Sequence, residues 1–528
     1  MKNCPTTPVL DFLDQAADLA TARAMGRYAL LVGLLLIGPA RAQDPIETVR
    51  AFRIENEARI LREFVEFLEI PNVSSDAPNI RRNAEYIRKA LGKRGINAEL
   101  LEIADASPVV FAEIETPGAT RTLGIYVHYD GQPVETARWT NSPWKPALYT
   151  AAIENGGVRR PMPKPGEPTD PEWRLYARAS GDDKAPIIAA LTALDALRGA
   201  DIALTANIKF FFEGEEEIGS PHLAEFLKKY RDRIDVDAWI IMDGPSHQSR
   251  RPQLVFGVRG ITGFDITVYG ATRYLHSGHY GNWAPNPAMM MAQLLASMKN
   301  DAGRVLIDGF YETVEPLTPE GKRALASVPK IGEAMRHELG LRETEANSAP
   351  YVQRLLLPSL NVRGLVSGTV GETARNVIPN TATASIDIRL VSGNDPDAML
   401  DLVESHIRRQ GYKIVREEPD LETRRAYAKI AKVTRHRGYK AARTSMSIPI
   451  VKEIVRAASR AAGEPIIQLP TLGGSLPLYL FTDDLQKPTV IAPIANHDNN
   501  QHAPDENIRL GNLWYGIDLI AAIFTMPR

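Results

Sequence analysis

The segment 206–220, ANIKFFFEGEEEIGS, joins an apolar run directly to a cluster of glutamates. The apolar part, residues 206–212, has the length and composition of a buried strand. Glu213 and the triplet Glu215, Glu216 and Glu217 follow it at once. Ligands of open α/β sheets bind outside the carboxyl ends of the strands, so this segment predicts a site at such an edge.

Two further apolar runs end in the same way. His128 and Asp130 follow the predicted strand 122–127, and Asp243 follows the predicted strand 238–242. Helical patterns at residues 184–197 and 221–230 alternate with these strands. This alternation predicts an α/β unit with a mostly parallel sheet, whose strand ends bring imidazole and carboxylate groups to one edge.

The hydrophobic pattern changes after about Gly260. Residues 264–268 and 381–390 alternate apolar with polar side chains, which is typical of an antiparallel sheet with one buried face. Helices predicted at 287–299 and 396–410 would cover that face. The α/β pattern resumes after about Ser445. We therefore expect a catalytic domain in two parts, 43–258 and 443–528, with an inserted α+β lid or dimerisation domain at 259–442. The basic run 424–443 is interpreted as a solvated face at the returning linker.

Composition excludes several classes of protein. The chain of 528 residues carries 62 Lys and Arg against 64 Asp and Glu, so it offers no basic excess for nucleic acid. The apolar runs are too few for a polytopic membrane protein. Cys4 is the single cysteine, so a cysteine-based zinc site is excluded and any metal must bind histidine and carboxylate groups.

The N-terminal region has the pattern of a signal peptide. Arg23 and Arg27 precede the apolar run 28–37, and the tripeptide Ala-Arg-Ala ends at Ala42. We expect cleavage after Ala42 and export to the periplasm or the medium, with no stable membrane span afterwards. The alternative is an uncleaved membrane anchor. Met25 begins a conventional signal peptide by itself, so residues 1–24 are open to interpretation as a misassigned start.

Crowded carboxylates repel one another unless a cation neutralises them. Two histidines with several carboxylates form a ligand set that suits zinc. Two metals roughly 3.5–4 Å apart can hold a hydroxide and polarise a carbonyl, and a spare carboxylate then acts as the general base. Asp182 and Asp183, before the predicted helix at 184, belong to this inventory, although each could instead cap that helix.

Five motifs occur in one order along the chain and together resemble the M20 metallopeptidases. This dinuclear zinc group includes carnosinase-like dipeptidases, glutamate carboxypeptidases and aminoacylases. The resemblance covers essentially the whole chain after residue 42. It rests on His128-Tyr129-Asp130, Ser180-Gly181-Asp182-Asp183-Lys184, Glu216-Glu217-Ile218-Gly219-Ser220, Asp243, and His502-Ala503-Pro504-Asp505-Glu506. The chain departs from the family at Ala179 and Ala185, where glycine is usual.

The resemblance implies a role for each of these residues. One metal would be held by His128, Asp182 and Asp243, and the other by Asp182, Glu217 and His502. Asp130 would orient the His128 imidazole. Glu216 would be the general base, although Glu215 leaves a one-residue shift of this register open. His497 competes with His502 for the last ligand but lacks the matching context.

The resemblance also assigns residues outside the metal site. His276, in Leu275-His276-Ser277-Gly278, would stabilise the oxyanion in the active site of a neighbouring subunit, which implies a homodimer. Arg389 would grip the substrate carboxylate. The loop Gly473, Gly474 and Ser475 would bind the same carboxylate, with Asn376 a weaker candidate for this pocket. From the residues alone, an exposed sheet residue is the favoured interpretation of Arg389. The glycine loop is open to interpretation as an ordinary turn.

The expected function is an exported metallopeptidase that hydrolyses dipeptides or C-terminal residues of short peptides. A hydroxide held by two divalent metals would attack, with glutamate as the general base. Zinc is the expected metal, and manganese or cobalt suits the same ligands. The alternatives are an N-acyl-amino-acid deacylase with the same site and a non-catalytic peptide-binding protein. The expected partners are a small peptide or N-acyl amino acid and a second copy of the chain, with no nucleic acid.

Overall fold

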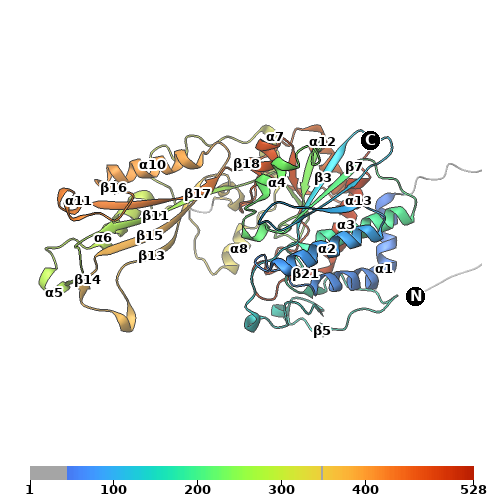
Figure 1. Ribbon diagram of the computed structural model, residues 1–528, viewed down its shortest axis with the longest axis horizontal. Helices are drawn as coiled ribbons and strands as arrows, with labels where there is room; N and C mark the ends of the chain where they lie inside the picture. The colour runs from blue at the N-terminus through green and yellow to red at the C-terminus, as the bar shows by residue number, and fades with distance from the viewer. Residues whose placement is uncertain (1–43, 346–348, 528) are drawn as a thin grey trace, which may run out of the picture. The chain divides into compact units, whose positions relative to one another are not determined.

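The structure is a computed structural model that describes residues 44–345 and 349–527 (Figure 1). The expected signal peptide 1–42, with Cys4, lies outside the described residues.

The largest element is an eight-stranded sheet with the order β1-β2-β7-β3-β8-β20-β9-β19. Its four central strands run parallel, while β1, β2 and β9 add antiparallel pairings towards the edges. The strands span β1 (Ala98–Leu101), β2 (Val109–Ile114), β7 (Asn207–Glu213), β3 (Thr122–His128), β8 (Ala238–Ile241), β20 (Thr489–Ile491), β9 (Gln253–Val255) and β19 (Ile467–Leu469). The parallel centre confirms the mostly parallel sheet expected from the sequence.

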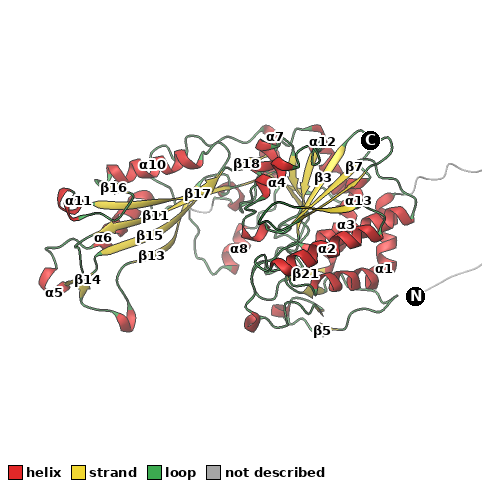
Figure 2. Ribbon diagram, in the orientation of Figure 1, coloured by secondary structure: helices red, strands yellow, loops and turns green. Residues whose placement is uncertain are grey.

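Helices cover both faces of this sheet (Figure 2). One face packs against α1 (Pro45–Leu68), α2 (Ala77–Lys93), α3 (Lys184–Gly199), α12 (Pro449–Ala462) and α13 (Leu510–Phe524). The other face packs against α4 (Leu223–Lys229) and the segment 478–485. Successive side chains of β7 alternate between these layers: Phe210 and Phe212 lie in the first core and Phe211 in the second. Burial of both faces explains why the central strands read as continuous apolar runs.

A second sheet of five strands has the order β13-β15-β11-β17-β16 and is antiparallel except for its β16–β17 pair. It consists of β13 (Ser359–Val366), β15 (Thr381–Leu390), β11 (Gly260–Tyr269), β17 (Ile430–Tyr439) and β16 (Lys413–Val415). Its apolar face packs against α6 (Pro287–Met298) and α10 (Pro396–Arg409). These are the helices predicted to cover it.

The expectation of a linker in the basic run is wrong for β17. Ile430, Ala431 and Val433 are buried in the core of the second sheet. The basic residues between and beyond them are half-buried or exposed and pair with acidic groups, as Lys432 does with Glu418. A strand with one wet face can therefore carry many charges.

Smaller elements complete the described chain. A four-stranded sheet and two two-stranded ribbons contain β4 (Ala147–Tyr149), β5 (Arg159–Arg160), β6 (Arg174–Tyr176), β21 (Asn507–Arg509), β12 (Leu275–His276), β14 (Val377–Ile378), β10 (Gly257–Val258) and β18 (Ala442–Arg443). The short helices are α5 (Ser277–Tyr280), α7 (Pro319–Ser327), α8 (Gly332–Glu338), α9 (Tyr351–Arg354) and α11 (Leu421–Ala426). Residues 161–171, which contain five prolines, lie between β5 and β6 and form no helix or strand.

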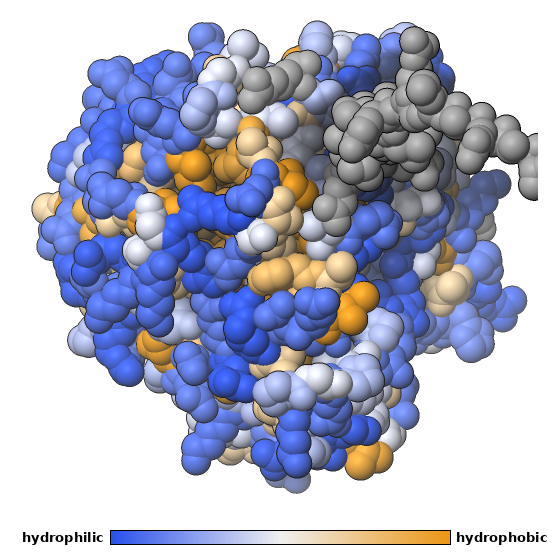
Figure 3. Space-filling view, turned by 90° about the vertical axis from the view of Figure 1, so that its right-hand side faces the viewer, coloured by the Kyte–Doolittle hydropathy of each residue, from blue (hydrophilic) through white to orange (hydrophobic). Residues whose placement is uncertain are grey.

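Hydrophilic side chains dominate the face drawn in Figure 3, and apolar residues gather in smaller areas between them. Among the helices of residues 44–345 and 349–527, none combines the length and apolar character needed to cross a membrane.

Candidate active site

The ends of three neighbouring strands build the site. His128 ends β3 and pairs in register with Glu213, which ends β7. On its other side β3 is in register with β8, where Tyr126 pairs with Ile241, two residues before Asp243. The parallel register therefore brings the polar residues that follow each strand to one edge, as the sequence predicts.

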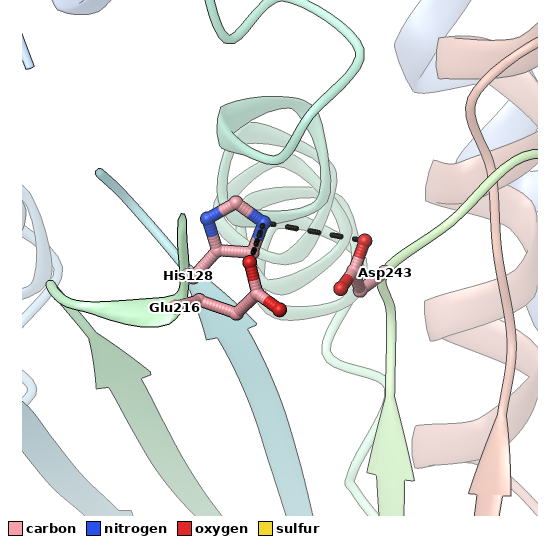
Figure 4. Close-up of side chains that lie close together, drawn as sticks. All are labelled: His128, Glu216 and Asp243. Carbon is pink, nitrogen blue, oxygen red and sulfur yellow. Dashed lines mark ion pairs between the residues drawn. The ribbon is translucent and has the colours of Figure 1, made fainter. Parts of the chain in front are cut away.

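The first donor group contains His128, Glu216 and Asp243. Their side chains point towards one another from different strand ends (Figure 4). Nε2 of His128 lies 3.9 Å from Oε2 of Glu216 and 4.0 Å from Oδ1 of Asp243. His128 is fully buried, so its imidazole is held in a fixed position.

The second donor group contains Asp182, Glu217 and His502. Nε2 of His502 lies 3.2 Å from Oδ2 of Asp182 and 3.1 Å from Oε2 of Glu217. The other oxygen of Asp182, Oδ1, lies 2.9 Å from Nε2 of His128. Asp182 therefore presents one carboxylate oxygen to each group, which is the arrangement of a bridging ligand.

Asp130 connects the first group to the glutamate turn. Its Oδ1 lies 3.3 Å from Nδ1 of His128, and its carboxylate accepts the backbone N–H groups of Glu216 at 3.2 Å and Glu217 at 3.0 Å. The hydroxyl of Ser74 donates a further bond of 2.8 Å. One buried carboxylate thus fixes the two glutamates by hydrogen bonds and lies beside the imidazole of His128.

Asp183 does not act as the helix cap considered from the sequence. It precedes α3, but its side chain makes no cap hydrogen bond. Its Oδ2 instead accepts the backbone N–H of His128 at 3.4 Å.

The electrostatics of the site favour a bound cation. Burial, reinforced by repulsion from neighbouring carboxylates, raises the pKa of Glu216 well above its ordinary value and that of Asp243 to about 7. Burial also opposes ionisation of Asp182, but hydrogen bonds with His128 and His502 outweigh it and lower the pKa of Asp182. Two imidazoles among several buried carboxylates fit divalent cations of the zinc type, which would neutralise this crowding.

Arg389 and the glycine loop, both expected to bind the substrate carboxylate, contact each other. Nη1 of Arg389, on β15, donates to Oγ of Ser475 at 2.7 Å. Gly474 lies beside it in the same loop, and its carbonyl accepts the backbone N–H of Arg259 at 3.1 Å. Gly473 lies against the side chain of Leu355. The structure therefore joins a guanidinium and a hydroxyl in one place.

His276 and Asn376 form a separate pair. His276 lies on β12 opposite Val377 of β14, and the carbonyl of Asn376 accepts the backbone N–H of Ser277 at 3.0 Å. Within the described residues, His276 makes no hydrogen bond or ion pair with either donor group. Its ring lies 4.5 Å, between centroids, from that of His279.

Some polar contacts of the site were not selected from the sequence. Nε2 of Gln501 donates to Oδ2 of Asp182 at 2.7 Å, and Nε2 of Gln132 donates to Oε2 of Glu217 at 2.9 Å. Gln501 directly precedes His502, and Gln132 follows Asp130 by two residues. This proximity to the motifs is the sequence feature from which both contacts could be predicted. His497 belongs to neither donor group among the described residues and lies 3.9 Å from Asp498.

The parallel sheet and the donor groups at its strand ends define a metal-dependent hydrolase. The sequence profile of Peptidase family M20/M25/M40 matches residues 124–525, and the chain belongs to this family. It is therefore a peptidase, as the resemblance of its motifs implied.

Relatives and solved structures agree with this placement. The Cys-Gly metallodipeptidase dug1 of Schizosaccharomyces pombe is 24% identical over 477 residues, covering 86% of this chain and 92% of its own. The Beta-Ala-His dipeptidase of Homo sapiens is 26% identical over 435 residues, covering 79% and 77%. The crystal structure of the M20 family metallo-carboxypeptidase Sso-CP2 from Sulfolobus solfataricus matches with a TM-score of 0.71 and 29% identity, covering 88% of this chain and 98% of its own.

Proposed function

We propose that the protein is a dipeptidase whose substrates carry a free C-terminal carboxylate, and that two divalent cations activate its site. The observation that carries the proposal is the position of Asp182, which presents one oxygen to each donor group, with Glu216 beside it. The names of the two sequence relatives, both dipeptidases, support the choice of substrate.

The five expected ligands divide between the two cations. His128 and Asp243 would hold one, Glu217 and His502 the other, and Asp182 both. When bound, the cations supply Lewis acidity that polarises the scissile carbonyl and makes water a stronger nucleophile near neutral pH. Zinc is our first choice, and manganese or cobalt suits the same donors.

Glu216 acts as the general base. Its carboxylate takes a proton from the attacking water and returns it to the nitrogen of the leaving amine. Glu216 lies beside the five proposed ligands but is not one of them, so its carboxylate is available for proton transfer. Burial raises the pKa of Glu216, and a neighbouring dication would lower it again, which allows proton transfer near neutral pH.

Arg389 and Ser475 bind the substrate carboxylate. Nη1 of Arg389 donates to Ser475 and Nε lies 3.6 Å from Asp387, which leaves Nη2 to form a charge-assisted pair with the substrate carboxylate. Burial raises the pKa of Tyr439 to about 12, and the charges of Arg389 and Glu216 both act on this phenol. Their common influence on Tyr439 supports a carboxylate pocket close to the general base.

A substrate panel tests this function. The panel contains a dipeptide, the same dipeptide with a C-terminal amide, and an N-acyl amino acid, each read by mass spectrometry with and without a chelator. The expected result is chelator-sensitive hydrolysis of the dipeptide, slow hydrolysis of its amide and none of the N-acyl amino acid. Hydrolysis of the N-acyl amino acid alone would indicate a deacylase. Arg389 could bind the free carboxylate of either substrate, so only the panel separates the two functions.

We further propose a homodimer through the five-stranded sheet. Its edge strand β13 exposes apolar residues: Val362 is 41% exposed, Leu365 57% and Val366 63%. Such an edge pairs readily with another chain, and a second copy would bring His276 to the neighbouring site. A mixture of subunit-exchanging His276→Ala and Glu216→Ala chains should then regain activity. Complete failure of two folded, exchanging variants to complement would refute the shared site.

Export also stays a proposal, supported by the N-terminal sequence pattern. N-terminal sequencing of protein recovered from the periplasm or the medium should begin at Gln43. A product that retains residues 28–37 would favour the membrane anchor.

A further inference from the structure

Glu506 is a fully buried carboxylate that no step of the proposed reaction uses. Its Oε1 accepts the backbone N–H of Gly181 at 3.1 Å and that of Asp182 at 3.0 Å. Its Oε2 accepts Nη1 of Arg178 at 2.7 Å and the backbone N–H of Ala179 at 3.1 Å. Four donors converge on this one side chain, so both of its oxygens are satisfied.

These contacts join the two loops that supply Asp182 and His502. Glu506 follows His502 by four residues, and its own carbonyl accepts the backbone N–H of Ala177 at 3.1 Å. The next residue, Asn507, begins β21, which pairs antiparallel with β6. Hydrogen bonds to the side chain and the backbone carbonyl of Glu506 therefore hold residues 177–182 against the loop that carries His502.

Each of these two loops contains a residue with an uncommon backbone conformation. Ala179 has a φ of +61° and His502 a φ of +64°, in the left-handed region that residues with a side chain adopt rarely. The bond from Ala179 N–H to Glu506 fixes the first of these conformations. Glycine would adopt the same φ at no steric cost, whereas alanine carries a Cβ atom.

We propose that Glu506 is the positioning residue that sets the distance between Asp182 and His502 for cation binding. The inference rests on the proposed function, since it takes Asp182 and His502 to be metal ligands. Glu506 touches neither cation nor substrate. It accepts the backbone N–H of Asp182, and its own loop carries His502. Without this carboxylate, the distance between the two ligands should no longer be fixed.

The test variant is Glu506→Gln, which keeps the shape of the side chain. Glutamine has one accepting oxygen, so its NH₂ group would face either Gly181 and Asp182 or Arg178 and Ala179, which are all donors. The matched control is Glu57→Gln. Glu57 is also buried, pairs with Arg53 at 2.6 Å, and accepts the backbone N–H and hydroxyl of Thr169 at 3.0 and 2.8 Å.

The readout is binding of Zn²⁺ and Co²⁺ to chelator-treated full-length protein, measured by calorimetry and by the visible spectrum of the cobalt form. We expect Glu506→Gln to weaken metal affinity about 10–100-fold, the range found when groups supporting metal ligands are removed, and to alter the cobalt spectrum. The control should keep wild-type affinity and spectrum even where its melting temperature falls. Activity should return to Glu506→Gln in part at high metal concentration.

Each outcome bears on one claim. Equal metal affinity and equal cobalt spectra in wild type and Glu506→Gln would overturn the positioning role and leave Glu506 a stabilising residue. Wild-type protein that binds neither metal would instead refute the proposed function. If Glu506→Gln does not fold, Glu506→Asp replaces it: the charge remains but the reach shortens, with the same expected loss of affinity.

Discussion

Replacing Arg389 with methionine should damage binding of one substrate group and little else. Arg389 is 34% exposed, donates a 2.7 Å bond to Ser475 and lies 3.6 Å from the buried Asp387, whose carboxylate keeps the 2.9 Å bond from Asn361 after the substitution. A hydrogen bond to a charged group contributes about 1.5–3 kcal/mol. At about 1.36 kcal/mol per factor of ten, kcat/KM for a dipeptide should fall about 10-fold to about 160-fold.

The assay compares a dipeptide with its C-terminal amide on both enzymes. The amide lacks the carboxylate, so Arg389→Met should change its slow hydrolysis by less than about 3-fold. Arg88→Met is the matched control, because Arg88 is also partly exposed, at 43%, and pairs with Glu85 at 2.7 Å on α2, outside the site and the five-stranded sheet. It should leave both substrates unaffected. An equal loss for dipeptide and amide would refute the carboxylate pocket and indicate a general disturbance of the site.

Three further predictions concern the site and the stability of the chain. Glu216→Gln should keep its metals and lose about 10²–10⁴-fold in kcat, whereas Asp182→Ala should lose metal as measured by elemental analysis. Equal metal loss in both variants would mean that Glu216 is a ligand and that the assignment of the glutamates is wrong. Burial raises the pKa of Glu404, but hydrogen bonds from two arginines outweigh it and lower that pKa below its ordinary value. Its stabilisation is therefore present at pH 7 and lost as the pH falls through the folded-state pKa. Glu404→Gln should thus lower the melting temperature at pH 7, and by progressively less as the pH falls below the ordinary glutamate pKa. Gly214→Ala would place a methyl carbon 2.5 Å from a buried tyrosine hydroxyl and should cost about 1–3 kcal/mol in thermal unfolding, while Gly199→Ala, with open space around it, should not.

The central strands are predictable from the sequence because their burial on both faces leaves continuous apolar runs. Strand β3 begins where it was predicted, at residue 122, and extends one residue further, to His128. The ends of β3, β7 and β8 follow from these runs, and with them the positions of His128 and Asp243. A polar residue directly after a buried strand is therefore a readable signal.

Strand β17 was missed because its charges are explained only by contacts with other elements. Arg435 pairs with Glu404 of α10 at 2.8 Å, which no local pattern encodes. Glu506 was known only as the last residue of a motif, because its partners are backbone N–H groups more than 300 residues earlier. Roles that depend on such distant backbone contacts do not appear in side-chain spacing.

The central claim is that dipeptide hydrolysis depends on cations held around Asp182. The most direct measurement is a titration of chelator-treated protein with Zn²⁺ or Mn²⁺ while dipeptide hydrolysis is followed by mass spectrometry, with Asp182→Asn in parallel. We predict no turnover without metal, recovery that is complete at two equivalents in the wild type, and no recovery in Asp182→Asn. Turnover that persists in the chelated protein, or equal recovery in the variant, would contradict the account.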